Sequence, residues 1–321
     1  MSHSTVLKCS KKVHKHKISK WLKDEGVYSM LPKILTCDDK YNAVLHEKNG
    51  TEFEEETPTI KGDSLEIDVK VTPKDGGNYI FYWSSFSEDS DTDMMNINQP
   101  SEAYRGYGSQ NRGLIKTDEK GNGTLTLNCP SIYREGKKLY PRHVHYTYLD
   151  KDNHWSEDVE TVEVMCHFPY EAMKKIVEDG TRVVVSAFSP EKKMIPKSLN
   201  LYHDDVKKQG GVSKMTSYIR KKIRDILIEK NEDKVLLYKG LEGFLDSGEN
   251  RTSDTPLVVY GENSESEDTD ILIKILCECG YVNIVKYSGG IEEWSKREDS
   301  DTTVEDVVED SENEEDDEKE S

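Results

Sequence analysis

Two histidines separated by one residue form the most specific chemical pattern in the sequence. His143 and His145 lie in the segment PRHVHYTYL, for which we predict a strand. Because strand side chains alternate between two faces, both imidazoles should share one face, with Val144 and Tyr146 on the other. Imidazole commonly binds transition metals, and a nearby phenolate, a hard anionic donor, would favour ferric iron. The segment is therefore a candidate metal site.

Two other interpretations fit the same histidines. Buried or surface histidines with ordinary hydrogen-bond partners are the commonest outcome of such a pattern. A structural zinc site is the second, with His143 and His145 joined by Cys166 or His167 in the nitrogen and sulfur set that zinc accepts. The colour and identity of the bound metal would separate zinc from iron.

An ordered series of motifs surrounds the two histidines. Its parts, in chain order, are Trp83, Ala103-Tyr104, Arg112-Gly113, Thr117-Asp118, Gly121, Pro130-Ser131-Ile132-Tyr133, Pro141-Arg142-His143-Val144-His145 and Thr161. The series resembles the catalytic β-sandwich of the intradiol ring-cleavage dioxygenases, over about residues 63–168. The ordered series is more specific than any one of its parts.

The resemblance implies a non-haem ferric ion, Fe(III), and a small aromatic diol of the catechol type as substrate. The implied ligands are Tyr104, Tyr133, His143 and His145. In the family, the tyrosine at the Tyr133 position leaves the metal when substrate binds and accepts a proton from the diol. Because residues 86–100 form a polar insertion, Tyr107 competes with Tyr104 for the first tyrosine position.

One catalytic position departs from the family. The arginine that steadies charge on the substrate is missing from its place, because Tyr140 precedes Pro141 there. Arg142 lies two residues late and is our candidate for the role, although a guanidinium presented from a neighbouring face would be a poor substitute. Two functions therefore stay open: an intradiol-type dioxygenase, or a non-enzymatic binding or scaffold protein built from two degenerate enzyme folds.

The pattern changes near residue 168. Before it, short alternating segments predict the strands of a β-sandwich, at 65–71, 78–84, 123–129, 142–149 and 161–168. After it, predicted helices alternate with short apolar strands, as in an α/β layer with a parallel sheet. The helices are expected at 170–180, 213–230 and 269–279, and the strands at 181–188, 234–238, 256–260 and 283–287.

Three motifs in this second part resemble a rhodanese domain, over about residues 169–297. They are Ile195-Pro196-Lys197-Ser198-Leu199-Asn200, which is similar to the family's His-Ile-Pro-Gly-Ala-Ile-Asn, Gly280-Tyr281-Val282-Asn283-Ile284, and Gly289-Gly290-Ile291-Glu292-Glu293-Trp294. The resemblance implies an active loop after the segment PLVVY, where the family carries its nucleophilic cysteine. Here that position is Gly261.

The other catalytic positions of this family are also replaced. Ser186 and Phe188 stand where the family has its early Asp and Arg, and Met194 stands where it has His. The loop after Gly261 is acidic and would repel thiosulfate or a persulfide. We therefore expect no sulfurtransferase activity, and interpret this domain as an inactive docking or regulatory module.

Charge is distributed unevenly along the chain. Residues 298–321 hold fourteen acidic residues and one lysine, and so carry −13 of the net charge of −19. We expect this tail to be disordered, with a protein partner for the tail or for the rhodanese-like domain as an alternative to simple solubilisation. Residues 1–62 are interpreted as a basic arm and lead-in. The acidic total argues against general nucleic-acid binding.

Two further features bear on localisation. No apolar stretch approaches the roughly 20 residues that span a bilayer, so no membrane span is expected. The six cysteines form no Cys-x-x-Cys pair and no dense framework, which favours a reducing, cytoplasmic compartment.

Overall fold

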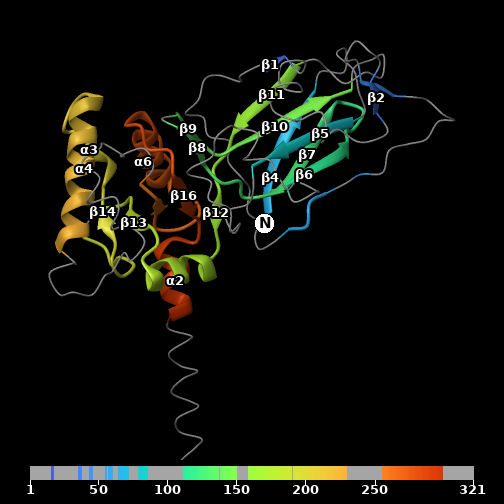
Figure 1. The fold of residues 1–321 in the computed structure, drawn as a ribbon. Coiled ribbons are helices and arrows are strands. Elements are labelled where there is room, and N and C mark those ends of the chain that lie inside the picture. Colours follow the sequence, from blue (N-terminus) through green and yellow to red (C-terminus); the bar gives the residue numbers. More distant parts are fainter. Residues whose placement is uncertain are drawn as a thin grey trace, which may run out of the picture. The chain divides into compact units, whose positions relative to one another are not determined.

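The computed structural model describes two compact units (Figure 1). The described residues are 55, 57–60, 64–71, 79–85, 111–136, 138–149, 158–189, 191–229 and 255–298, with three short strands nearer the N-terminus. The first unit ends at His167 and the second begins at Phe168, while Gly280–Asn283 is grouped with the first. The expectations for the insertion at 86–100, the strand at 234–238, the tail after residue 298 and most of the N-terminal arm lie outside the described residues.

Antiparallel strands build the first unit. One sheet has the order β1-β11-β10-β5-β6, and the pair β4-β7 forms another. Their bounds are β1 His16–Lys17, β4 Ser64–Lys70, β5 Tyr79–Ser84, β6 Arg112–Lys116, β7 Asn122–Asn128, β10 His143–Tyr148 and β11 Asp158–Glu163. Two smaller pairs are β2 Leu35–Cys37 with β3 Ala43–Leu45, and β8 Tyr133–Glu135 with β9 Lys138–Tyr140.

The two main sheets share one apolar core. Alternate residues of each strand point into it because side chains on a strand alternate between its faces. The cluster consists of Leu65, Ile67, Val69, Val71, Ile80, Tyr82, Ile115, Leu125, Leu127, Val144 and Val164. Two antiparallel sheets packed on one core agree with the expected sandwich class. The strands predicted at 65–71, 78–84, 123–129 and 142–149 are confirmed.

Other strands were not predicted correctly. The run at 161–168 is divided, because β11 ends at Glu163 and β12 covers only His167–Phe168. The strands β6, β8 and β9 were not predicted at all. β8 and β9 have three residues each, too few for an alternating pattern to be recognised.

The strand β5 is buried along its whole length. Ile80 and Tyr82 face the shared core, so Phe81 and Trp83 must point to the opposite face of the sheet. Phe81 and Trp83 are each only 1% exposed, which means that this second face is covered as well.

A parallel sheet organises the second unit. Its order is β12-β16-β15-β13-β14, and the pairs among β16, β15, β13 and β14 are parallel. Beyond β12, the bounds are β13 Val183–Ser186, β14 Leu199–Asn200, β15 Leu257–Tyr260 and β16 Ile284–Tyr287. All residues of β13, β15 and β16 are buried, as continuous apolar runs predict for parallel strands.

Helices accompany this sheet. The predicted helices are confirmed as α2 Tyr170–Asp179, α4 Val212–Glu229 and α6 Glu267–Glu278, whereas the short helix α3 His203–Lys207 was not predicted. Gly180 ends α2 in the left-handed conformation, with φ of 63°. The predicted apolar side of α4 is buried, including Met215, Ile219 and Ile223. In the described part of the chain, no helix is long and apolar enough to cross a membrane.

A disulfide joins Cys129 and Cys166 in the first unit. The disulfide was not predicted from the sequence, because its two cysteines are 37 positions apart and belong to no short cysteine motif. The bridge counts against the reducing compartment that the cysteine spacing favoured, since disulfides persist mainly in oxidising environments. It also rules out Cys166 as a thiolate ligand of zinc.

Candidate functional site

Three of the predicted iron ligands come together in the first unit. The hydroxyl of Tyr133 lies 3.2 Å from Nε2 of His143, and the ring centres of His143 and His145 are 4.7 Å apart. Their exposed fractions are 1%, 7% and 2% in chain order, so water is largely excluded. Tyr104 and its competitor Tyr107 lie outside the described residues.

The strand β10 places both imidazoles on one face, as predicted. Val144 belongs to the shared core and Tyr146 packs against it, so His143 and His145 project from the opposite side of the sheet. His145 is paired across the strands with Trp83 of β5 and with Thr161 of β11. Directly opposed residues lie on the same face, and these three therefore form a row across the sheet.

Each imidazole is held through its Nδ1 atom. Nδ1 of His143 donates to the carbonyl oxygen of Pro141 at 2.6 Å, because a carbonyl can only accept. In a neutral ring Nε2 then accepts, and the hydroxyl of Tyr133 donates to it. Nδ1 of His145 lies 2.8 Å from Oγ1 of Thr161. In metal-binding histidines the ring nitrogen that does not coordinate the ion usually has a partner of this kind, which fixes the orientation of the ring.

A buried polar network fixes the segment that carries Tyr133. The side chain of Asn111 donates to the carbonyl oxygens of Ser85 and Asn128, at 2.9 and 3.2 Å, and accepts from the backbone N–H of Asn128. The hydroxyl of Ser85 donates to the carbonyl oxygen of Ser131, two residues before Tyr133, at 2.7 Å. The disulfide at Cys129 fastens the start of the same segment. None of these roles was predicted.

Two aromatic contacts border the cluster. Tyr140 on β9 stacks on Tyr133 with ring centres 4.6 Å apart, and the Trp83 ring lies 5.4 Å from that of His145. Nε1 of Trp83 is buried and has no hydrogen-bond partner among the residues that the structure describes. Such an orphaned donor costs free energy in an otherwise satisfied core, so the neighbourhood of His145 can accommodate an acceptor from a bound group.

Arg142 is buried, with 2% of its surface exposed. Its Nη2 donates to Oδ1 of Asn283 at 3.1 Å, within the set of residues grouped with the first unit. The guanidinium thus has a protein acceptor, and a role toward substrate stays a prediction.

A metal ion fixes the distance between the donor atoms that bind it. Two donors about 2 Å from one ion, the zinc–nitrogen length, at an angle of about 100° lie about 3 Å apart. The 3.2 Å separation of Tyr133 and His143 matches this. Among the described residues, no group of three or more His, Cys, Asp or Glu is placed to hold a metal ion. A site here needs the phenolate of Tyr133.

The second candidate site is the loop that follows β15. A Cβ atom added to Gly261 would lie 2.3 Å from Oγ1 of Thr269 and 2.5 Å from Oγ of Ser266. Real Cβ contacts are essentially never that short, so the space that a cysteine side chain would need is filled. Oγ1 of Thr269 is itself buried without a hydrogen-bond partner.

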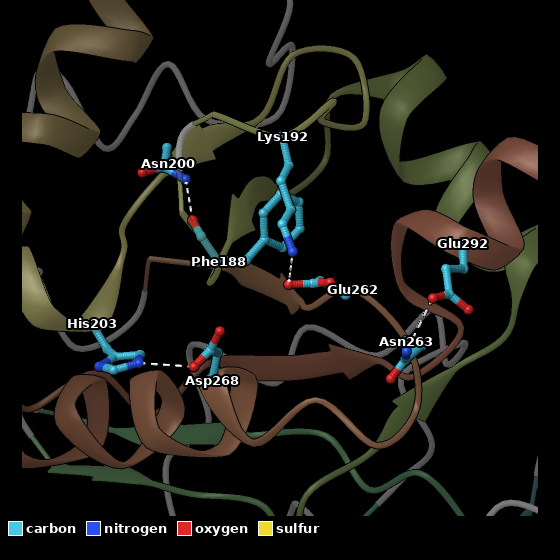
Figure 2. A network of polar contacts seen from close by, with 8 residues as sticks. All are labelled: Phe188, Lys192, Asn200, His203, Glu262, Asn263, Asp268 and Glu292. Atoms are coloured by element: carbon cyan, nitrogen blue, oxygen red, sulfur yellow. Dashed lines mark hydrogen bonds and ion pairs between the residues drawn. The ribbon is translucent and has the colours of Figure 1, made fainter.

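Polar contacts close the mouth of this loop (Figure 2). Lys192 forms an ion pair with Glu262, and the amide of Asn263 donates to Glu292 at 3.1 Å. Gly290 packs directly on the loop, because its Cβ position would be 2.5 Å from the backbone of Glu262, and its φ is 63°. Contacts with neighbouring side chains therefore fix the position of the acidic loop.

Ser186, Phe188 and Met194, the positions compared with catalytic residues in the sequence, make structural contacts. Asn200 donates to the carbonyl of Phe188 at 2.8 Å and to the hydroxyl of Ser186 at 2.9 Å, and the Ser186 hydroxyl contacts the sulfur of Met194 at 3.3 Å. Burial raises the pKa of Tyr260, so its phenol stays neutral.

A buried histidine also contacts the N-terminal end of α6. His203 lies 2.9 Å from Asp268 through Nε2 (Figure 2). This pair was not predicted from the sequence.

No protein-family model and no curated protein sequence matches the chain.

Proposed function

We propose that the first unit binds a ferric ion and acts on a catechol-like aromatic diol as an intradiol-type dioxygenase. The observation that carries the proposal is the buried contact between Tyr133 and His143, 3.2 Å long, beside the ring of His145. Tyr104 is the proposed fourth ligand. Its position is inferred from the sequence resemblance alone.

The chemistry of the donors supports iron over softer metals. Two neutral imidazoles and a phenolate offer nitrogen and hard anionic oxygen, and Cys166 offers no thiolate because it is in a disulfide. The Nδ1 partners Pro141 and Thr161 orient both rings before any ion arrives. When bound, a ferric ion would activate the diol for direct attack by O2 between its two hydroxyl groups.

The protein's own residues supply orientation and a proton acceptor. In its phenolate form, the oxygen of Tyr133 is the atom that can take a proton from a substrate hydroxyl, and its contact to Nε2 of His143 places it beside the donor set. Burial of Tyr133, His143 and His145 excludes bulk water and strengthens electrostatic contacts there.

The test compares three variants of the full chain after reconstitution with ferric iron. We expect His143→Ala and Tyr133→Phe to lower retained iron at least about tenfold, because each removes a ligand. Tyr140→Phe is the matched control, since it keeps the ring that stacks on Tyr133 and removes a hydroxyl that is no proposed ligand. Iron content, visible absorption and oxygen uptake with catechols are measured on the same samples.

The outcomes separate binding from catalysis. Full retention of iron in both ligand variants would overturn the metal site. Iron with the red-brown absorption of a tyrosinate complex, but no oxygen uptake with any catechol, would overturn the dioxygenase and leave a metal-binding scaffold.

For the second unit we propose a non-catalytic docking or regulatory role. The crowding of Gly261 by Ser266 and Thr269 supports this, because no thiolate fits where the family's cysteine belongs. We expect the full chain to show no thiosulfate:cyanide sulfurtransferase activity above a protein-free blank. Turnover that is abolished by substituting Cys277, the partly exposed free cysteine of α6, would contradict this role.

A further inference from the structure

A basic stretch stands out in the second unit against the acidic balance of the whole chain. Residues 207–224 contain seven Lys or Arg and no Asp or Glu, whereas the chain carries a net charge of −19. Five of the seven belong to α4, namely Lys214, Arg220, Lys221, Lys222 and Arg224, and all five are exposed. We call these five residues the basic side of α4.

The geometry of α4 separates this side from the core. Successive residues are 100° apart around a helix, so Lys214, Lys221 and Arg224 lie on the side opposite Met215, Ile219 and Ile223. The three apolar residues are no more than 9% exposed. Packing therefore holds the helix in place and leaves the cations directed toward solvent, with Asp225 as the nearest exposed acid in sequence.

An exposed apolar residue begins the same helix. Val212 is 48% exposed and is the one large apolar side chain classed as exposed among the described residues. The cations of α4 therefore remain the feature that could attract an acidic ligand to this surface.

We propose that the basic side of α4 binds the acidic tail of the same chain, residues 299–321. The tail supplies thirteen acidic residues. It follows directly on the helical residues 290–298. A random-coil chain of 23 residues spans about 26 Å on average. The inference does not depend on the proposed iron site.

A nucleic acid is the competing ligand for such a surface. The chain's overall acidity disfavours it, because phosphates would be repelled by the tail and by the rest of the surface. The tail also has an advantage in concentration, since it is covalently attached and its binding is intramolecular.

Crosslinking of the full-length protein tests the proposal. A zero-length carbodiimide reagent joins a lysine amine to a carboxylate only where the two touch. We expect Lys214, Lys221 and Lys222 to link to the tail at least about fivefold more often than Lys175 and Lys274, which are exposed on other helices. About 0.5 M salt should lower the yield several-fold, because it shortens the screening length to a few ångströms.

A charge-reversal variant sharpens the result. Arg220→Glu with Arg224→Glu keeps the three reactive lysines and should lower their links to the tail at least about fivefold. The control, Lys175→Glu with Lys274→Glu, makes the same change in net charge elsewhere and should leave the yield unchanged. Circular dichroism checks that both variants are folded.

Four results would overturn the proposal. They are equal yields from all exposed lysines, yields unaffected by the arginine substitutions, links that join isotope-labelled to unlabelled chains, and tight binding of a DNA oligonucleotide that the arginine substitutions abolish. The third result would assign the surface to a second copy, and the fourth to nucleic acid.

Discussion

The Tyr133 cluster of the first unit and the Gly261 loop of the second unit differ in how their chemistry depends on the backbone. In the first, the side chains project from paired strands, and cross-strand partners such as Thr161 orient them. In the second, the position for a nucleophile lies on a loop, and neighbouring side chains now occupy the space. Side chains on paired strands keep their relative positions as long as the sheet folds. A position on a loop can instead be blocked when neighbouring side chains fill the space beside one residue.

The first prediction concerns the stability that is lost when a cysteine side chain is placed at Gly261. We expect Gly261→Cys to lower the free energy of unfolding by about 3 kcal/mol, because the new Cβ overlaps Thr269 and Ser266. Adding Ser266→Gly and Thr269→Ala should recover most of the loss. Gly211→Cys is the control, since nothing lies within 4 Å of its Cβ position. Urea unfolding measures all three, and equal stability of Gly261→Cys and Gly211→Cys would show that the loop is not closed.

The next prediction concerns Tyr146, which lies on the face of β10 opposite His143 and His145. Unfolding at alkaline pH tests whether a change on that face affects the proposed iron site on the other. Burial, then Glu160 and Tyr148, raises the pKa of Tyr146 to about 12. This stabilisation is complete below pH 10, the value for an unfolded tyrosine, and is lost as the pH rises through about 12. A shift of this size corresponds to about 3 kcal/mol. Tyr146→Phe should therefore flatten the fall in stability between pH 10 and 12 without lowering iron content. A variant that loses iron would show that the faces are coupled.

The anchor of His145 predicts a smaller effect. Thr161→Val keeps the shape of the side chain but removes the hydroxyl 2.8 Å from Nδ1. We expect iron affinity to fall about tenfold, as is usual when an outer partner of a ligand histidine is removed. Thr126→Val on β7 is the control. Metal retained against a competing chelator provides the measurement, and identical retention in both variants would mean that Thr161 does not orient the ring.

The smallest effect concerns Lys197, at the position where the resembled motif has glycine. Its φ is +64°, the one positive value at a non-glycine residue in the described part of the chain. Lys197→Gly and Lys197→Ala both remove the bond from Nζ to the carbonyl oxygen of Val177. Glycine should be the more stable by about 1 kcal/mol, because only alanine retains the strain of a Cβ at that φ. Equal melting temperatures would argue against a glycine-type backbone here.

Most of the correct sequence predictions came from the periodic spacing of apolar residues. Alternation in LEIDVKV and in the His143–His145 segment located strands and faces, and the apolar run of α4 located its buried side. These signals are local, so one segment suffices to detect them.

Features that depend on distant residues were not predicted. The Cys129–Cys166 bridge, the side-chain bonds of Asn111 and the stacking of Tyr140 on Tyr133 join segments that only folding brings together. The crowding at Gly261 is of the same kind, because Thr269 approaches it from the next helix. The sequence places glycine at position 261, and the structure adds that Thr269 and Ser266 fill the space beside it.

The disulfide has a consequence for how the first unit reaches its folded state. Tyr133, His143, His145 and Thr161 all lie between Cys129 and Cys166, so the bridge closes a covalent ring around three of the proposed ligands and the residue that contacts His145. In the chain-entropy description, closing a loop of 37 residues removes about 4 kcal/mol of conformational freedom from the unfolded chain. Oxidation before folding would thus confine the donors to a small volume, so that assembly of the cluster becomes a search within one tethered loop.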